Sequence, residues 1–207
     1  MPENLRKIIL ASKSADRTEL FTHAGITFDI LKTNVDEKEL KKNISDPILL
    51  VKELAKRKAL YAKDELKREN ISAIIIAADT IVELNGEIIG KAKDEKEAFL
   101  ILKKLIGTSH NLITGIAVTE TNNPKFIIDY EITTVEFLKL TDEELHGYII
   151  TEEWKERAGA YSINDKASLF INRLNGSSSN VIGFPMHKLF EILKDEFNMN
   201  LFHKEEI

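Results

Sequence analysis

The pattern of apolar positions along the chain is centred on residues 74–91. Residues 74–78 are apolar without alternation and begin with three isoleucines, which is typical of a strand buried on both faces. A second β-rich run follows Asn85 and Gly86, a pair that favours a type I′ turn because both central positions of that turn need a positive φ. The pattern therefore predicts a β-hairpin whose first strand is buried.

Asp79 ends the apolar run where another isoleucine would continue it. Ideal pairing, counted back from the turn, places Thr80 opposite Lys91, so Asp79 and Lys91 would point to opposite faces. They can converge only if the pairing bends or stops near Ala78. A buried charge without a partner costs several kcal/mol, which favours a functional role for Asp79. An ordinary strand-end hydrogen bond to a loop amide remains the alternative.

The remaining periodic segments predict a chain of strands and helices. Strands are expected at residues 7–11, 28–31, 110–119, 126–139 and 169–174, and helices at about residues 15–24, 47–68, 94–106, 141–150 and from Pro185, as first helical residue, onward. The two long strands are expected to pair antiparallel, and residues 157–165 and 176–180 to form loops. No repeat, low-complexity segment or linker interrupts the sequence, so we expect a single domain over residues 1–207.

The helix expected over residues 47–68 contains one anomalous cation. Its apolar stripe is formed by Val51, Leu54, Ala55, Ala62 and Leu66. The cations outside the stripe, expected to form a solvated face, are Lys52, Lys56, Arg57 and Lys63. Lys58 falls inside the stripe. Its ammonium group either extends along the stripe to water or points into a polar pocket at the edge of the core, and the sequence leaves both alternatives open.

The first expected strand is followed by a short polar turn and a helix, an arrangement that can bind an anion. Ser14 is a natural N-cap, and Asp16 suits the first helical turn. Backbone amides at such a helix start point at a phosphate, and Ser12 and Arg17 would add a hydroxyl and a fork of donors. A well-capped surface helix explains the same residues equally well. The glycine and lysine spacing of a P-loop is absent.

Composition narrows the classes of protein that fit this pattern. The net charge of −5 argues against broad binding to DNA or RNA, but a local basic pocket could still hold a small phosphorylated ligand. The absence of cysteine excludes disulfides and thiolate metal sites and suits a reducing compartment. No apolar run approaches the ~20 residues of a membrane span, and residues 1–4 lack the apolar region of a signal peptide. We therefore expect a protein without membrane or nucleic acid polymer partners.

The polar residue types favour phosphate chemistry. The histidines have no HExxH or other metal-ligand spacing, and there is neither a GxSxG motif nor a cysteine nucleophile, so zinc catalysis and covalent acyl transfer have little support. The acidic segment at residues 35–37, which ends in Glu37, is most simply a solvated connector. The carboxylates, ammonium groups, guanidinium groups and hydroxyls that remain suit a magnesium-assisted attack on phosphate.

Six short motifs occur in the order seen in one known family. They are residues 10–14 (LASKS), residues 54–59 (LAKRKA), residues 78–80 (ADT) followed by Gly86 and Lys91, residues 107–118 (GTSHNLITGIAV), residues 158–161 (AGAY) and residues 183–185 (GFP). Each motif alone is weak, but together they span nearly the whole chain. The sequence resembles the Maf family of nucleoside triphosphate pyrophosphatases, once described as septum-formation inhibitors.

The resemblance implies an α/β fold with an elongated mixed β-sheet flanked by helices, in a two-lobed, ITPase-like architecture with a central cleft. It also implies hydrolysis of a nucleoside or deoxynucleoside triphosphate to the monophosphate and pyrophosphate in the cytoplasm, with Mg²⁺ or Mn²⁺ as the divalent metal. Removal of non-canonical or excess nucleotides would be a house-cleaning role. A homodimer is suggested by the resemblance alone.

The resemblance also assigns roles to residues that the pattern singled out. Asp79 matches the general base that would deprotonate the water attacking the α-phosphate. The residues expected to hold the triphosphate are Ser12, Arg17, Lys58 and Lys91. Glu37 matches an acidic residue that would bind the metal together with Asp79. Fixed cations and a metal ion would stabilise the negative charge that develops in the transition state.

The resemblance relates three positions to substrate choice, and the residues found there leave the base preference open. Asp16 stands where the family often has arginine, and a carboxylate cannot replace a phosphate-binding guanidinium. If Asp16 faces the phosphates, Asp16→Arg is expected to tighten triphosphate binding by removing a repulsive charge. Asn164 stands where members that prefer dTTP and UTP usually carry glutamine, whereas Thr80 favours that pyrimidine subgroup.

A second function from a different class fits the same motifs. The chain could be a nucleotide-binding regulator of cell division and septum formation that keeps the pocket but has lost turnover. Retention of Asp79, Lys58 and Lys91 favours the enzyme, because a protein that only binds nucleotide needs no general base. Because of Asp16, the regulator remains an alternative to the enzyme.

Overall fold

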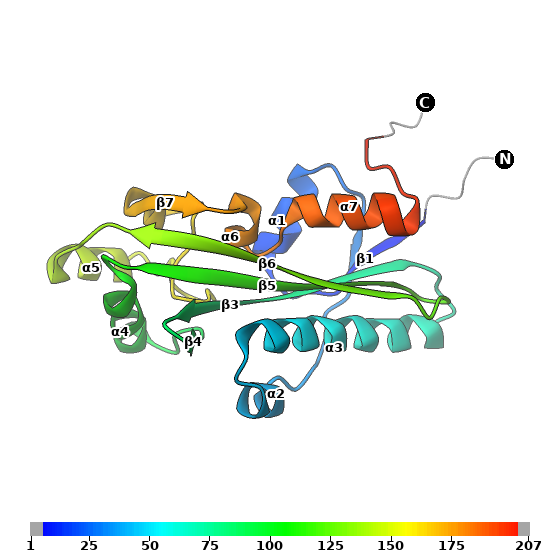
Figure 1. Cartoon of the computed structure of the whole chain (residues 1–207), viewed down its shortest axis with the longest axis horizontal. Coiled ribbons are helices and arrows are strands. Elements are labelled where there is room, and N and C mark those ends of the chain that lie inside the picture. The colour runs from blue at the N-terminus through cyan, green and yellow to red at the C-terminus, as the bar shows by residue number, and fades with distance from the viewer. Residues whose placement is uncertain (1–5, 203–207) are drawn as a thin grey trace.

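A seven-stranded mixed sheet runs through the protein, whose computed structural model describes residues 6–202 (Figure 1). The strands are β1 (Ile8–Leu10), β2 (Asp29–Ile30), β3 (Ile74–Leu84), β4 (Glu87–Ile89), β5 (Ser109–Glu120), β6 (Phe126–Phe137) and β7 (Ile171–Asn175). They lie in the order β2-β1-β3-β5-β6-β7, and β4 pairs with β3. Strand β1 is parallel to β2 and β3, whereas the other pairs are antiparallel. The N-terminal residues considered above for a signal peptide lie outside the described residues.

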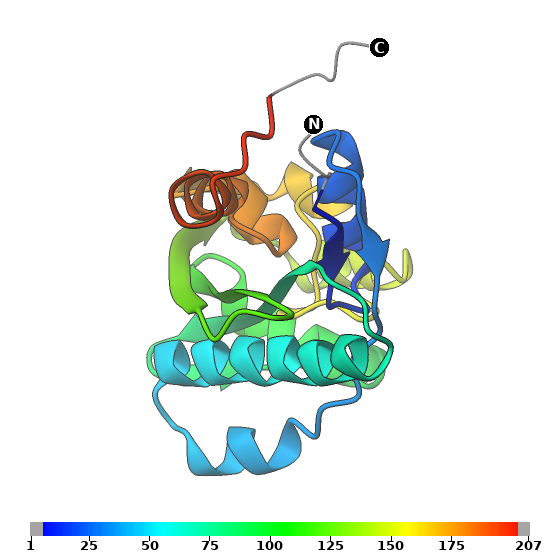
Figure 2. The ribbon, with the colours of Figure 1, turned by 90° about the vertical axis from the view of Figure 1, so that its right-hand side faces the viewer.

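Helices cover both faces of the sheet. They are α1 (Ala15–His23), α2 (Lys38–Asn43), α3 (Pro47–Arg68), α4 (Glu95–Leu105), α5 (Asp142–Ile149), α6 (Ser178–Ile182) and α7 (Met186–Phe197), with a short 3-10 helix η1 (Lys166–Leu169). Helix α3 lies along one face with α2 beyond it, and α1, α6 and α7 lie on the other face (Figure 1, Figure 2). Within residues 6–202, no helix combines the length and the apolar character needed to cross a membrane.

The central strand β3 packs against both helical layers because its side chains alternate between them. Ile74, Ile76 and Ala78 belong to the hydrophobic cluster that includes residues of α1 and α7. Ile75 and Ala77 belong to the cluster that includes residues of α3. All five residues are fully buried, which confirms the two-sided burial predicted from the apolar run.

A separate hydrophobic core fills the other end of the sheet. Leu102 and Leu105 of α4 and Leu145 of α5 pack there with Trp154 and Phe170. The cores thus lie toward opposite ends of an elongated sheet, and this division corresponds to the two lobes expected from the resemblance (Figure 1). The lobes meet along β3, where β1 ends and β4 begins.

The predicted hairpin, long helix and long antiparallel pair are confirmed. Asn85 and Gly86 have φ angles of 52° and 85°, as a type I′ turn requires. Helix α3 has the bounds expected from its apolar stripe and from its proline at the first turn. Strands β5 and β6 pair antiparallel along nearly their full length.

Three local predictions are wrong. Residues 176–180, expected to form a loop, include Ser177, the N-cap of α6, and the first turn of that helix. Pro185 is the N-cap of α7 rather than its first helical residue. Helix α2, within the segment interpreted as a connector, was not predicted. Both α2 and α6 are too short for a helical period to be recognised.

Lys63 requires a further correction, because it does not lie on a solvated face. The residue is 7% exposed. Its Nζ donates to Thr119 Oγ1 at 3.1 Å and to the carbonyl oxygen of Asn123 at 2.5 Å, and it lies 5.3 Å from the ring centroid of Phe126. Lys63 therefore ties the end of α3 to the turn between β5 and β6. A helical wheel cannot show these partners, which come from another part of the chain.

Gly115 of β5 permits a close approach of α3 to the sheet. A Cβ built on Gly115 would lie 2.3 Å from the carbonyl oxygen of Val51, so any larger residue would collide with the helix backbone. Gly115 is paired with Asp79 across β3 and β5. The close approach therefore holds the first turns of α3 against the polar end of the buried strand, about two helical turns before Lys58.

Candidate active site

One edge of β3 is interrupted where its polar residues begin. Strand β5 pairs with the other edge from Ile74 to Glu83, but on this edge β1 pairs only as far as Ile76 and β4 pairs only from Val82 onward. Within the described residues, no strand covers this edge at residues 77–81, which include Asp79 and Thr80. This interruption, called the β3 gap below, exposes a buried strand to groups from other elements.

The hairpin pairing ends earlier than predicted. Its last pair is Val82 with Ile89, so the pairing does not continue to Ala78. The physical reason is that the chain leaves β3 after Ile89, and Lys91 instead forms an isolated antiparallel bridge with Ala158. The end of the hairpin and the residue-158 loop therefore lie side by side at one border of the β3 gap.

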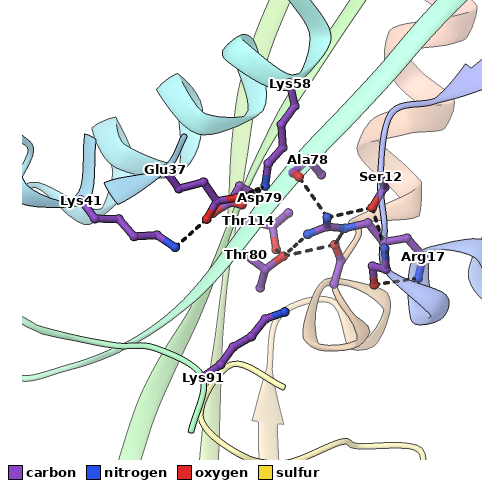
Figure 3. Close-up of polar contacts among 12 residues, drawn as sticks. Ser12, Arg17, Glu37, Lys41, Lys58, Ala78, Asp79, Thr80, Lys91 and Thr114 are labelled. Atoms are coloured by element: carbon purple, nitrogen blue, oxygen red, sulfur yellow. Dashed lines mark hydrogen bonds and ion pairs between the residues drawn. The ribbon is translucent and has the colours of Figure 1, made fainter. Parts of the chain in front are cut away.

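On the α3 side of the β3 gap, the ammonium group of Lys58 joins two carboxylates (Figure 3). Lys58 Nζ donates to Asp79 Oδ1 in a short contact and lies 2.8 Å from Glu37 Oε1. The side chains of Lys58 and Asp79 are only 13% and 10% exposed. Lys58 thus points into a polar pocket, which decides between the alternatives that the sequence left open.

Glu37 is held in this cluster by the packing of α2. Leu40 of α2 packs against Leu50 of α3, which places Glu37, the residue before α2, beside Lys58. The second carboxylate oxygen of Glu37 accepts a hydrogen bond from Lys41 at 2.6 Å. Burial raises the pKa of Glu37, but the ammonium groups of Lys58 and Lys41 outweigh burial and lower the pKa to about 2. Glu37 is therefore a fixed charge rather than part of a solvated connector.

On the opposite face of β3, Arg17 enters the β3 gap from α1 (Figure 3). Thr80 follows Asp79 along the strand and so points to the other face. Arg17 Nη2 donates to Thr80 Oγ1 at 2.9 Å, and Nη1 donates to the carbonyl oxygen of Ala78 at 3.0 Å. Arg17 Nε donates to the carbonyl oxygen of Gly183 at 2.8 Å. The guanidinium group thus satisfies a strand-edge carbonyl that no neighbouring strand reaches.

Most of the donors of Arg17 are already engaged. Its Nη1 also donates to Ser12 Oγ at 3.3 Å, so hydrogen bonds within the described residues engage four of its five N–H groups. Ser12 Oγ accepts a second bond, from the backbone N–H of Ser14 at 3.1 Å. Burial lowers the pKa of Arg17, and the carboxylates of Asp79 and Glu37 oppose that effect. One N–H of Arg17 and the hydroxyl proton of Ser12 remain to meet a ligand.

Lys91 borders the β3 gap from the hairpin side. In Figure 3 its side chain points toward Thr80. Its Nζ lies 3.0 Å from Glu156 Oε2, and the two side chains are 58% and 89% exposed. An exposed ion pair of this kind contributes about 1 kcal/mol or less. Lys91 can therefore exchange Glu156 for an anionic ligand at little cost.

Asp16 faces a cation instead of an open phosphate site. Its carboxylate forms an ion pair with the guanidinium group of Arg157. Asp16→Arg was expected to remove a charge that repels the phosphates, but Asp16 is paired with Arg157, so the structure gives no basis for that expectation. Asp16 and Asn164 instead line one pocket of about 210 Å³, whose other lining residues are Glu19, Leu20, His23 and Ile182. The two unusual positions found in the sequence thus meet at the same pocket.

The sequence interpretation missed three groups that shape the site. Lys41 neutralises Glu37, and Arg157 neutralises Asp16. Thr114 Oγ1 lies 2.9 Å from Thr80 Oγ1, because the two residues are paired across β3 and β5. Thr114 could be found only from the register of two strands that no short turn connects. Arg157 begins a small-residue loop, a signal of close approach to a ligand that does not identify the partner of the arginine.

This arrangement can hold a polyanion next to a base. Lys58, Lys91 and Arg17 approach the β3 gap from three elements, and the carboxylate of Asp79 lies among them. Within residues 6–202, no three His, Cys, Asp or Glu side chains lie close enough to form a metal site alone. The two carboxylates that share Lys58 can still hold Mg²⁺ when substrate phosphates complete the coordination.

The chain is similar to known proteins over nearly its whole length. A family model described as Maf-like protein matches residues 7–196. A protein named dTTP/UTP pyrophosphatase from Thermoanaerobacter sp. (strain X514) is 42% identical over 195 residues, which are 94% of this chain and 99% of that protein. A protein of the same name from Alkaliphilus oremlandii (strain OhILAs) is 43% identical over 197 residues, or 95% and 100% of the two chains.

A solved structure also gives a match, at much lower similarity. It is the nucleoside-triphosphatase, or dITP/XTP pyrophosphatase, from Mycobacterium abscessus, with 11% sequence identity and a TM-score of 0.35. The match covers 63% of this chain and 72% of that one.

Proposed function

Because the chain belongs to the Maf-like protein family, we propose that it is a nucleoside triphosphate pyrophosphatase that hydrolyses dTTP and UTP to the monophosphate and pyrophosphate. The names of the relatives described above support this activity, and the similarity spans nearly the whole chain. The observation that carries the proposal is the ammonium group of Lys58, shared by Asp79 and Glu37 at the β3 gap. A carboxylate base surrounded by fixed cations suits attack on a phosphate ester or anhydride.

In the proposed reaction, Asp79 is the general base. Its carboxylate accepts a proton from a water molecule while the water oxygen forms a bond to the α-phosphorus. The bond between the α-phosphorus and the oxygen that bridges to the β-phosphate breaks, and pyrophosphate leaves with the electron pair. A positioned base of this kind contributes about 10²- to 10⁴-fold to the rate.

The cations around the β3 gap are proposed to hold the triphosphate. Negative charge grows on the phosphate oxygens during the reaction, so fixed positive charges stabilise the transition state more than the ground state. Lys58 and Lys91 offer ammonium groups from opposite borders of the β3 gap (Figure 3). Ser12 and the remaining N–H of Arg17 add neutral and charged donors from the α1 side.

Glu37 and Asp79 are proposed to hold a divalent cation. Their oxygens already converge on one cationic group, the ammonium of Lys58, so their geometry fits a shared ion. Carboxylates and phosphate oxygens are the ligands that Mg²⁺ prefers, and they suit Mn²⁺ as well. The ion would neutralise charge on the phosphates. Glu37 remains ionised and able to bind it at any ordinary pH, because its pKa is lowered to about 2.

The pyrimidine preference is proposed from Thr80 and from the names of the relatives. Asn164 and Asp16 are proposed to meet the nucleoside at the pocket that they line. The amide of Asn164 can both donate to and accept from the edge of a base. Leu20 and Ile182 give the same pocket apolar walls that suit a planar ring.

The cellular setting follows from the same proposal. We infer that residues 1–207 act as one Maf-like domain, because the site combines residues from Ser12 to Gly183. We also propose a cytoplasmic, house-cleaning enzyme that acts on free nucleotides rather than on nucleic acid polymers, which suits the net charge of −5. A homodimer is also proposed, from the family resemblance alone.

The regulator of cell division is the weaker candidate. Within residues 6–202, no observation favours a site that binds nucleotide without turning it over. Asp79 lies in the β3 gap and pairs with Lys58, and a protein that only binds a nucleotide polyanion would gain from a neutral residue at this position.

Product analysis tests the proposed function. Purified protein is incubated separately with dTTP, UTP, dATP and GTP in ¹⁸O-labelled water with Mg²⁺ or Mn²⁺. The products are then separated, and their masses are measured by mass spectrometry. We expect monophosphate and pyrophosphate, with the label in the monophosphate and with dTTP and UTP consumed fastest. Diphosphate and orthophosphate would contradict the proposal, and nucleotide that binds without reacting would support the regulator.

A further inference from the structure

Arg157 lies between two carboxylates and has no part in the proposed chemistry. Its guanidinium group contacts Asp16 of α1, and its Nη2 lies 3.9 Å from Asp165 Oδ2. The side chains of Arg157 and Asp16 are 26% and 20% exposed, so the pair is largely shielded from water. Arginine suits this position because its planar fork can meet two acceptors at once. Arg157 thereby connects both ends of its own loop, residues 157–165, to α1.

The middle of the 157–165 loop is anchored to other elements. The backbone N–H of Gly159 donates to the carbonyl oxygen of Gly90 in the hairpin at 3.1 Å. The hydroxyl of Tyr161 lies 2.8 Å from Nε2 of His110, and both side chains are buried. These contacts fix the loop to the hairpin and to the core, but they do not fix its distance from α1.

The pocket between α1 and the loop depends on that distance. Asp16 and Leu20 line it from α1, whereas Asn164, the neighbour of Asp165, lines it from the loop. The ion pair of Arg157 with Asp16 is therefore located where the two walls of the pocket are joined. A shift of the loop away from α1 would widen the pocket and withdraw the amide of Asn164.

We propose that Arg157 is a positioning residue that, by pairing with Asp16 and Asp165, holds Asn164 at a fixed distance from α1 and so sets which nucleobase the pocket accepts. The statement about nucleobases rests on the proposed function, whereas the statement about the loop does not. Loss of the pair frees the ends of the loop while Asp79 and Lys58 keep their places. Substrate binding and base discrimination then change more than the chemical step does.

Steady-state kinetics of three variants tests the role in base selection. Arg157→Gln is expected to raise KM for dTTP about three- to tenfold and to reduce its preference over dATP, with a smaller change in kcat. Asp16→Asn should shift the preference in the same direction. The charge-reversed double variant Asp16→Arg/Arg157→Asp should recover part of the loss, because it restores an ion pair at the same place.

Lys155→Gln is the matched control. It removes one positive charge two residues from Arg157, but the contacts of Lys155 are local: its Nζ pairs with the exposed Glu152 at 2.7 Å and lies 5.8 Å from the ring centroid of Trp154. We expect this variant to keep the KM and the base preference of the wild type. A loss equal to that of Arg157→Gln would overturn the proposal, because general charge near the site rather than the pair would then explain it.

Amide hydrogen exchange tests the loop without any turnover. Arg157→Gln is expected to speed exchange about tenfold at the amide of Asp165, which donates to the carbonyl oxygen of Ser162 at 3.3 Å, and the charge-reversed double variant should slow it again. Unchanged exchange in Arg157→Gln would overturn the positioning role, whatever happens to KM. If the wild type turns over no nucleotide, the proposed function fails, but the exchange result still decides whether Arg157 holds the loop.

Discussion

At the scale of the residue, the ammonium group of Lys58 sets the charge of the site. It is the shared partner of Asp79 and Glu37, and all three side chains are at least two-thirds buried. Removing one partner from such a cluster costs more than the net gain of forming it, because the remaining charges stay desolvated. The two carboxylates would also repel each other. Lys58 therefore stabilises the folded protein as well as preparing a position for a cation.

Lys58→Gln is expected to destabilise the protein by about 2–4 kcal/mol, because it leaves Asp79 and Glu37 close together without a cation. Lys41→Gln serves as the control, since the side chains of Lys41 and Glu37 are 47% and 31% exposed and pairs of this kind contribute about 1 kcal/mol or less. Urea unfolding at neutral pH measures both losses. Equal losses would show that Lys58 is not the partner on which the cluster depends.

Site residues that interrupt an apolar period can be predicted from the sequence, whereas residues outside any periodic stripe cannot. Lys58 and Asp79 stand out because each is a charge in an apolar period, and the structure brings these two together. The pairing of Arg157 with Asp16 has no such signal, because neither residue belongs to a periodic stripe and they lie far apart in the chain. Arg17 was expected at the site, but its bonds to backbone carbonyls depend on where β1 ends.

At the scale of the element, β3 and α3 form the frame of the site. Strand β3 supplies Asp79 to one face and Thr80 to the other, at a point where, within residues 6–202, β5 alone pairs with it. Helix α3 crosses the same strands closely because Gly115 has no side chain. Small displacements of α3 therefore change the contact between Lys58 and Asp79, which joins the two elements.

Gly115→Ala is expected to destabilise the protein by about 2–3 kcal/mol and to lower turnover at least tenfold, because its Cβ would lie 2.3 Å from the carbonyl oxygen of Val51 and would push α3 off the sheet. Thermal unfolding and nucleotide turnover measure the two effects. Gly147→Ala is the control, since nothing lies within 4 Å of its added Cβ in α5 and alanine favours the helix by about 0.5–1 kcal/mol. If Gly115→Ala kept both the stability and the turnover of the wild type, α3 could move away from the sheet without affecting either, which would contradict this prediction.

Elements with a long or regular pattern could be predicted, whereas short elements and register could not. The bounds of α3 follow from a stripe that spans several turns, and the hairpin follows from Asn85 and Gly86. Helix α2 brings Glu37 to Lys58, but it is too short to show a period. The end of the hairpin pairing at Val82 could not be predicted from the sequence either, because it results from the bridge of Lys91 with Ala158.

At the scale of the whole molecule, hydrophobic clusters at both ends share one sheet, and an unusual histidine lies at one end. His110 is 2% exposed, its ring packs against Phe137, and its Nε2 meets the hydroxyl of Tyr161. Its Nδ1 has no hydrogen-bond partner within the described part of the chain. Burial lowers the pKa of His110 to about 4. The folded protein therefore keeps His110 neutral at a pH where the unfolded chain binds a proton.

Acidification is expected to destabilise the protein between about pH 6.5 and about pH 4. The pKa of His110 is 6.5 without burial and about 4 in the folded protein, so the unfolded state binds more protons in this window and the free energy of unfolding falls as the pH falls. The loss levels off below the folded pKa. From about pH 7.5 to about pH 5 the contribution of His110 is about 2 kcal/mol.

Urea unfolding at these two pH values, on the wild type and on His110→Gln, isolates the contribution. The variant cannot take up a proton at this position, so its stability should depend less on pH by about 2 kcal/mol. An identical pH dependence in both proteins would mean that His110 is protonated as easily in the folded protein as in the unfolded chain.

The fold class could be predicted from the sequence, but the division of the hydrophobic core between the two ends of the sheet could not. Both cores draw on the same strands, so no linker or change of composition marks the boundary, and the lobes were expected only from the resemblance. The β3 gap has the same origin, because it results from how β1 and β4 end on a shared edge.

The most direct test of Asp79 as the general base is the turnover of dTTP by Asp79→Asn. The account predicts that kcat falls about 10²- to 10⁴-fold, because the amide cannot accept the proton of the attacking water. Binding of a non-hydrolysable analogue with a methylene bridge between the α- and β-phosphates should persist. Asp129→Asn is the control, since Asp129 pairs with Lys188 at 2.7 Å outside the β3 gap and should keep wild-type turnover. A kcat of Asp79→Asn within a few-fold of the wild type would contradict the account.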